Sequence, residues 1–171
     1  MNMRTKRNSS VKEQALHREQ SATQTLTKDA HNTATDERGA ENTPLDGRIA
    51  MAVRAASDKK AIDLIALDLR EIASFTDYFL IASGTNTRQV QAISDEIVEQ
   101  LKRAGTRAAR VEGYSTAEWV LLDYGDFIVH VFENKARRFY DLERLWREAA
   151  RIALPPDLTG DAESNTARNT L

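Results

Sequence analysis

The chain has 171 residues, with 24 Lys and Arg against 26 Asp and Glu, and it contains no Cys. Its formal net charge of -2 argues against nucleic-acid binding through bulk positive potential, and the lack of Cys excludes disulfide frameworks, thiolate metal sites and Cys nucleophiles. No uncharged apolar run reaches the roughly 18 residues that a bilayer span needs, and the first residues lack the apolar region of an export signal, so we expect a cytoplasmic protein without a membrane partner.

The two ends of the chain differ in composition from the middle. Residues 1–46 are dominated by Ser, Thr, Asn, Gln and charged residues, with no aromatic residue or Ile. Residues 155–171 have the same character, and Pro155-Pro156 should end the preceding helix. Such segments bury too little apolar surface to offset the entropy lost on ordering. We therefore predict a disordered extension over 1–46, one α/β domain over 47–154 and a disordered tail over 155–171.

The first half of the domain predicts two helices and two strands. A short amphipathic helix is expected over 47–57, after Pro44. Two apolar runs, 61–69 and 78–82, are typical of buried strands, and Ser83-Gly84 closes the second of them. A long amphipathic helix follows over 86–104, with an N-capping Asn at its start and a Gly just past its end.

The second half of the domain predicts three strands and a helix. A weak strand is expected over 107–111, and two apolar runs, 119–123 and 126–132, flank Tyr124-Gly125 as a hairpin with a two-residue turn. Helical spacing over 135–153 predicts a second long amphipathic helix. The expected order is α-β-β-α-β-β-β-α, which is typical of a single mixed-sheet α/β domain.

The two-residue turn determines which residues of the hairpin share a face. One face is apolar throughout and should lie in the core. The other face combines aromatic, aliphatic and acidic side chains. It carries three pairs: Trp119 opposite His130, Leu121 opposite Ile128, and Asp123 opposite Asp126. The two facing carboxylates should repel each other.

Two interpretations of this second face remain open. In one, a helix covers the face, so that Trp119 belongs to the core and the two Asp residues merely flank a turn. In the other, the face is partly exposed and binds a macromolecule, with Trp119 as an anchor and the carboxylates facing a basic partner. The exposure of the Trp119 ring distinguishes the two.

Three ordered motifs span most of the domain. The first is DYFLIASGTNTRQVQAISDEIVEQLK at 77–102, the second is EGYSTAEWVLLDYGDFIVHVF at 112–132, and the third is RRFYDLERLW at 137–146. Together they closely resemble the ribosomal silencing factor (Iojap) family, over about residues 47–154. The resemblance implies an α/β fold similar to nucleotidyltransferases but without their catalytic residues. It also implies binding to the large ribosomal subunit through ribosomal protein L-fourteen, which blocks joining of the small subunit.

The resemblance also indicates where a partner would bind. Family members use a surface around the EWVLLDYGD motif, which is residues 118–126 here. The predicted partner-binding residues are Trp119, Asp123, Tyr124 and Asp126, with Leu121 and His130 as further contacts. A basic ribosomal protein would relieve the repulsion between the two Asp side chains.

Enzymatic interpretations have less support in the sequence. A nucleotidyltransferase needs a Gly-Ser turn and two acidic residues on one strand face to hold Mg²⁺. Here Ser83-Gly84 has the reverse order, and Asp63 and Asp68 should point to opposite faces. We therefore expect no enzyme, metal or cofactor, and keep a degenerate nucleotidyltransferase-like, nucleotide-handling enzyme as the alternative. Residues 83–85 could cradle a phosphate at a helix start, although a turn with a cap is the simpler interpretation.

The last predicted helix begins with cations, which the helix dipole disfavours at that end. Arg137 and Arg138 should either pair with carboxylates such as Glu133 or Asp141, or contact ribosomal RNA phosphates.

Tyr140 and Trp146 have the spacing of residues that pack along one helix face, and both should belong to the core. The family resemblance implies a translation repressor, which would act by occlusion, and a homodimer is a third hypothesis if the Trp119 face pairs with itself.

Overall fold

The computed structural model describes residues 45–159, so the predicted disorder of 1–44 and 160–171 lies outside the described residues. The elements, in chain order, are α2 (Gly47–Asp58), β1 (Ile62–Asp68), β2 (Tyr78–Gly84), α3 (Thr87–Arg103), β3 (Arg110–Glu112), β4 (Trp119–Asp123), β5 (Phe127–Glu133), α4 (Asn134–Tyr140), α5 (Leu142–Leu145), β6 (Ala150–Ile152) and α6 (Pro156–Thr159).

The strands form one six-stranded sheet with the order β3-β4-β5-β2-β1-β6. The central pair β2 and β5 is parallel, and the other neighbouring strands are antiparallel. The parallel pair needs a crossover connection, which α3 begins after β2. The predicted mixed-sheet α/β fold is therefore confirmed.

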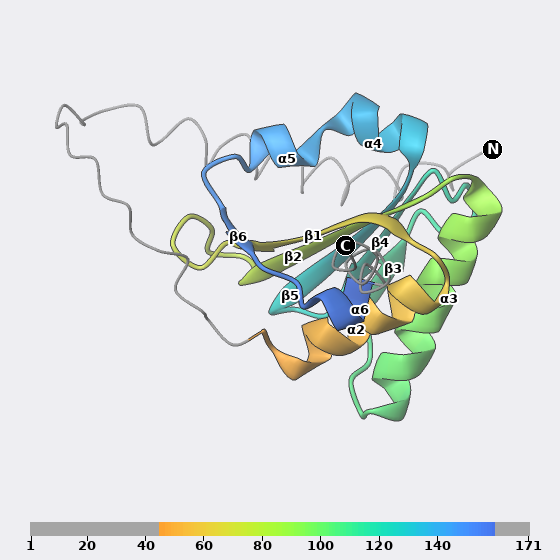
Figure 1. The fold of residues 1–171 in the computed structure, drawn as a ribbon, viewed down its shortest axis with the longest axis horizontal. Helices are drawn as coiled ribbons and strands as arrows, with labels where there is room; N and C mark the ends of the chain where they lie inside the picture. The colour runs from red at the N-terminus through yellow and green to blue at the C-terminus, as the bar shows by residue number, and fades with distance from the viewer. Residues whose placement is uncertain (1–44, 160–171) are drawn as a thin grey trace, which may run out of the picture.

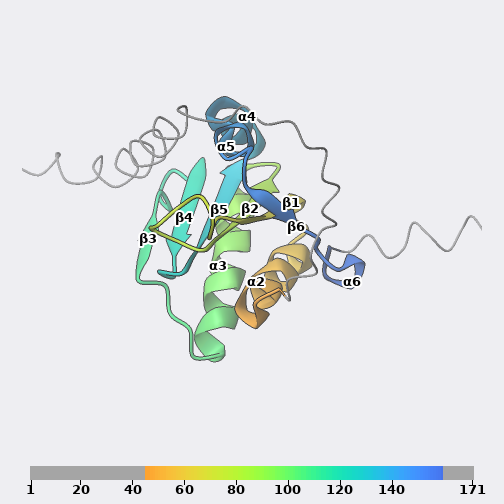
Figure 2. The same cartoon turned by 90° about the vertical axis from the view of Figure 1, so that its left-hand side faces the viewer.

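The sheet lies between two layers of helices, with α4 and α5 over one face and α2 and α3 over the other (Figure 1, Figure 2). Each layer encloses its own apolar cluster. The first cluster joins Ile49 and Val53 of α2 and Ile93 of α3 to Val120 and Val129 of the sheet, among others. The second cluster combines strand residues with Leu142 and Trp146, on the other face. The sheet is thus buried on both sides, which explains why its central strands read as nearly continuous apolar runs.

Helix α3 begins with the cap that its sequence predicts. Asn86 Oδ1 accepts a hydrogen bond from the Gln89 backbone N at 2.9 Å, and Gln89 Oε1 accepts one from the Thr85 backbone N at 2.8 Å. Residue 84 must be small here, because a Cβ on Gly84 would lie 3.0 Å from Val90 N. The turn after β2 therefore has the geometry of a capped helix start.

The hairpin of β4 and β5 has a longer loop than the predicted two-residue turn. Asp123 lies opposite Ile128, and Tyr124 N donates to Phe127 O at 3.0 Å. Every predicted pair is therefore wrong by two residues: Trp119 lies opposite Phe132, and Leu121 opposite His130. Because side chains alternate with a period of two, this shift leaves each residue on its predicted face.

The predicted helix over 135–153 is wrong beyond its first two turns. Asp141 has a φ of 46°, and its backbone N donates to Arg137 O, so α4 ends there and the short helix α5 follows. The chain then extends as β6 and pairs with β1. Trp146 is buried as predicted, but Tyr140 is 37% exposed and is not a core residue.

The beginning of the predicted tail is ordered. Residues 156–159 form α6, and Leu158 is buried in the same cluster as α2. Pro156 opens this helix, at a position where its missing N–H is harmless.

Candidate partner-binding surface

Three of the predicted contact residues lie in the interior. Trp119 is 3% exposed, Leu121 3% and His130 1%. The Trp119 ring shares a cluster with Leu142 and Trp146, from the segment that covers this face of the sheet. The exposed-anchor interpretation is therefore wrong for Trp119, and the interpretation in which helices cover the face is confirmed.

His130 is a packed residue with an unusual protonation state. Its Nδ1 accepts a hydrogen bond from Trp119 Nε1 at 3.2 Å, and its ring meets Phe79 edge-on at 4.6 Å between centroids. Burial lowers the pKa of His130 to about 3, because the charged form would lose its hydration. The imidazole is thus neutral at physiological pH.

The other predicted contacts lie at the hairpin loop, at the opposite end of the two strands from Trp119. Asp123 Oδ1 accepts from Gly125 N at 2.8 Å, and Gly125 adopts a φ of 91°, which favours glycine. The Tyr124 ring stacks on Phe127 with centroids 4.7 Å apart, and burial raises the pKa of Tyr124 to about 12. Tyr124 therefore holds the loop against the core and keeps only part of its surface for a partner.

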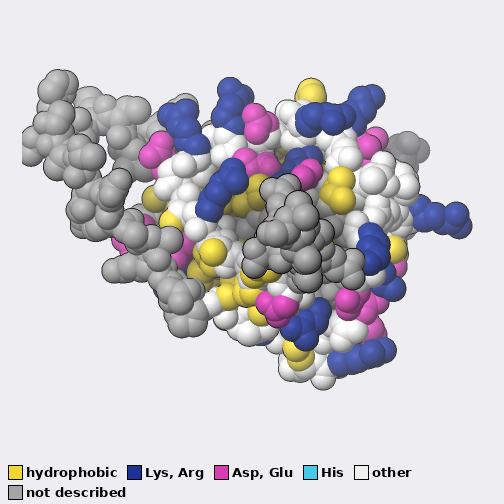
Figure 3. Space-filling model, in the orientation of Figure 1, with side chains coloured by type: hydrophobic (Ala, Val, Ile, Leu, Met, Phe, Trp, Pro, Cys, Tyr) yellow, Lys and Arg dark blue, Asp and Glu magenta, His cyan; other side chains and the backbone are white. Residues whose placement is uncertain are grey.

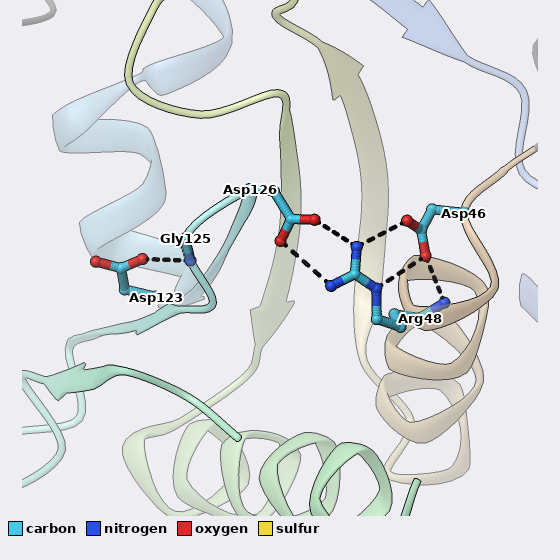
Figure 4. A network of polar contacts seen from close by, with 5 residues as sticks. All are labelled: Asp46, Arg48, Asp123, Gly125 and Asp126. Atoms are coloured by element: carbon cyan, nitrogen blue, oxygen red, sulfur yellow. Dashed lines mark hydrogen bonds and ion pairs between the residues drawn. The ribbon is translucent and has the colours of Figure 1, made fainter. Parts of the chain in front are cut away.

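Asp126 takes part in a network that the sequence did not reveal (Figure 4). Arg48 Nη1 donates to Asp126 Oδ1 at 3.3 Å and Nη2 donates to Asp126 Oδ2, while Nη2 also reaches Asp46 Oδ2 at 2.9 Å. Asp46 is also the N-cap of α2 and accepts from Arg48 N at 2.8 Å. This network joins the start of α2 to the hairpin loop, residues 78 positions apart.

The pair formed by Asp46 and Arg48 stays charged at neutral pH. The hydrogen bond from Arg48 lowers the pKa of Asp46 below its usual value, and Asp46 and Asp126 together raise the pKa of Arg48.

Asp77 lies in the same region, since its backbone N donates to Asp126 O at 2.8 Å. We call Asp46, Asp77, Asp123 and Asp126, with Arg48, the acidic tip. Counted alone, these four carboxylates and one guanidinium are net negative, and Arg110 lies opposite Asp123 on the neighbouring strand.

Residues 45–48 have the sequence pattern of an N-cap followed by a first helical turn, and this pattern could have identified Asp46 as the N-cap of α2. Nothing in the spacing predicts that Arg48 reaches Asp126. Contacts so distant in sequence depend on where α2 lies relative to the loop before β5, which local patterns do not encode.

Arg137 is buried and paired, as the carboxylate interpretation predicted. Its Nη2 lies 2.6 Å from Glu143 Oε1, and Nη1 donates to Ser83 Oγ at 2.8 Å and to Asp63 O at 2.7 Å. Asp63 has a φ of 52° and lies at a register shift in β1. One guanidinium therefore ties α4 to α5 and to both strands beneath them.

The enzymatic interpretations gain no support from this arrangement. Ser83 Oγ, at the end of β2, is held by Arg137. Among residues 45–159, no group of three or more His, Asp or Glu side chains could hold a metal ion. None of the helices in this part of the chain combines the length and apolarity that a bilayer crossing requires.

Comparison with known proteins identifies relatives over the same region. A family model described as "Ribosomal silencing factor during starvation" matches residues 41–170. The ribosomal silencing factor RsfS of Bacillus subtilis is 46% identical over 99 residues, which cover 58% of this chain and 84% of that protein.

Two further comparisons extend the match to a more distant protein and to a solved structure. The mouse protein named "Mitochondrial assembly of ribosomal large subunit protein 1" is 30% identical over 134 residues, covering 71% of this chain and 59% of its own length. A crystal structure from Bacillus halodurans superposes with a TM-score of 0.56 at 42% identity, covering 62% of this chain and 96% of that one.

Proposed function

Because this chain belongs to the ribosomal silencing factor family, we propose that it represses translation by binding the large ribosomal subunit at ribosomal protein L-fourteen and blocking the joining of the small subunit. The family match carries this proposal. The mouse relative's name links that protein to assembly of the large ribosomal subunit, which supports the same subunit as the partner here.

The proposed mechanism is occlusion without catalysis. A domain bound where the two subunits meet excludes the other subunit by occupying its contact surface, and it needs no chemical step. The effect then follows mass action, since repression depends on the concentration of the protein relative to its dissociation constant. A packed domain with a charged surface is sufficient for this role.

The acidic tip is the surface that we assign to the basic ribosomal protein. Asp126 is exposed and Asp123 and Tyr124 are half-buried, so all three can contact a partner. Lysine or arginine side chains across the interface would offset the negative charge that Arg48 only partly balances. Trp119, Leu121 and His130 are buried and support the β4–β5 hairpin from inside the fold rather than by direct contact with a partner.

Two measurements test the proposal. Cosedimentation with purified large subunits measures binding, and light scattering during subunit association measures the block. Asp123→Lys should slow association with large subunits at low salt, because it replaces attraction with repulsion. Glu99→Lys makes the same charge change on α3, where the side chain is 48% exposed, and serves as the matched control.

The outcomes separate the hypotheses. Binding that blocks subunit joining, and that Asp123→Lys weakens more than Glu99→Lys, supports the proposal. Failure of the wild-type protein to cosediment with large subunits would contradict it. Concentration-dependent sedimentation of the protein alone, with the dimer unable to bind subunits, would instead favour the self-association hypothesis.

A further inference from the structure

The outward face of α4 carries two cations and an exposed aromatic ring. Lys135, Arg138 and Phe139 follow the i, i+3, i+4 spacing of one helix face, whereas the buried Arg137 points to the sheet. All three side chains are exposed, and Phe139 is 81% exposed. A phenylalanine this exposed buries little apolar surface within its own domain.

Phe139 ends an unbroken row of aromatic rings that begins in the core. Phe132 stacks on Trp119 with centroids 4.9 Å apart, Trp119 contacts Tyr140 at 4.8 Å, and Tyr140 meets Phe139 edge-on at 5.1 Å. Trp119 and Phe132 are buried. The row therefore supports the exposed ring on a rigid base, which reduces the entropy lost when a ligand stacks on it.

The charge of this segment is opposite to that of the chain. Residues 134–152 contain six basic and three acidic side chains, a balance of +3, although the chain as a whole carries -2. Each of the three acids already pairs with an arginine: Asp141 with Arg144, Glu143 with Arg137, and Glu148 with Arg147.

The cations of the outward face are not balanced in this way. Within the described residues, neither the Lys135 ammonium nor the Arg138 guanidinium has an ion pair. Figure 3 shows Lys and Arg side chains gathered along the edge formed by α4 and α5.

We propose that this face binds ribosomal RNA of the large subunit, with an unpaired base stacked on Phe139 and backbone phosphates contacted by Lys135 and Arg138. Every base has a flat apolar surface, and stacking on an aromatic side chain is the common way to hold an unstacked one. Cations beside the ring match the phosphates that flank such a base. The inference rests on the proposed function, because it places the RNA on the same subunit.

The proposed RNA face is separate from the acidic tip. Within the tip, Asp123 and Asp126 lie where β4 ends and β5 begins, whereas α4 begins at the far end of β5. A basic protein and an RNA strand can therefore be bound at once, by surfaces of opposite charge. This division explains how a chain of net negative charge can bind a particle rich in phosphate.

Photocrosslinking on the intact large subunit tests the proposal. Phe139 is replaced by a photoreactive diazirine analogue of phenylalanine, and the same analogue at Tyr114, which is 40% exposed in the loop that contacts α3, is the control. Cosedimentation of each labelled protein is measured in the same samples. We expect an adduct with ribosomal RNA from position 139 that exceeds any from position 114.

Four outcomes contradict the inference: an adduct at position 139 only with a ribosomal protein, an adduct only with a second copy of this chain, equal RNA adducts from both positions, or no adduct although the protein cosediments. These outcomes leave the proposed function intact. If the unlabelled wild-type protein failed to cosediment with large subunits, both the proposed function and the RNA inference would be contradicted. Failure of the RNA inference alone can therefore be distinguished from failure of the proposed function.

Substitutions give an independent measure. Phe139→Ala should weaken binding to large subunits by about fivefold or more, as expected for loss of one stacked base. Arg138→Glu should weaken binding and make the salt dependence shallower, because one phosphate contact is lost. Phe139→Tyr keeps a stacking ring and should restore binding. Wild-type affinity in Phe139→Ala would overturn the inference. A loss of affinity could not be attributed to unfolding, because the Phe139 side chain is exposed and its removal leaves the core unchanged.

Discussion

Trp119 Nε1 donates a hydrogen bond to Nδ1 of His130 across 3.2 Å, inside the face of the sheet that α4 and α5 cover. The two residues lie on neighbouring strands but are not directly opposite, because Leu121 faces His130. Since Nδ1 accepts this bond, the neutral imidazole carries its proton on Nε2. The pair therefore holds one tautomer of a histidine that burial keeps uncharged.

This arrangement predicts a pH-dependent stability. The pKa of His130 is about 3 in the folded protein and about 6.5 when unfolded. As the pH falls through 6.5 the unfolded chain gains a proton that the folded state does not, so the free energy of unfolding should fall by about 2 kcal/mol between pH 7 and pH 5. Urea unfolding at pH 5, 6 and 7 measures the slope. His130→Gln, which keeps an acceptor, should flatten it, and equal slopes would contradict the prediction.

Trp119→Ala should destabilise the fold rather than remove an exposed contact. The ring is buried and stacked on Phe132, so its loss should lower the free energy of unfolding by about 3 to 5 kcal/mol. Leu101→Ala, which truncates a fully buried α3 residue, should have a comparable effect. Chemical denaturation of both variants provides the measurement. A Trp119→Ala protein of wild-type stability would mean that the indole is not part of the core.

Arg137→Met should be strongly destabilising. The methionine retains apolar bulk but leaves Glu143, Ser83 Oγ and the Asp63 carbonyl without their common donor. Breaking a buried pair of this kind costs about 3 kcal/mol or more. The matched control is Arg138→Met on the exposed side of the same helix, which should change the free energy of unfolding by at most about 0.5 kcal/mol. Similar denaturation midpoints for the two variants would refute the assignment.

Two glycine substitutions should have different effects. An alanine Cβ at Gly84 would lie 3.0 Å from Val90 N and 3.1 Å from Val90 Cγ2, so Gly84→Ala should displace the start of α3 and cost about 1 to 3 kcal/mol. At Gly47, in the first turn of α2, a Cβ would meet nothing within 4 Å, so Gly47→Ala should be neutral or slightly stabilising. Thermal unfolding of both variants tests the contrast, and an equal shift in Tm would contradict it.

The hairpin illustrates how far the sequence predicts the candidate site. The alternation of residues in β4 and β5 correctly assigned each side chain to a face, even though the loop is longer than predicted. The pairing was wrong because loop conformation, rather than alternation, determines the register. The position of Asp123 at the loop end of β4 could therefore be predicted, but its cross-strand neighbour, Ile128, could not.

The sequence by itself determined the order of the elements up to α4, the cap of α3 and the family resemblance, because these depend on local spacing and on motifs that are continuous in the chain. Only the tertiary structure decided that helices cover Trp119, that the last predicted helix breaks at Asp141 to supply an edge strand, and that Arg48 joins Asp46 to Asp126. The physical reason is that an apolar strand face has the same pattern whether its own helices or a partner cover it, and ion pairs between distant segments depend on packing.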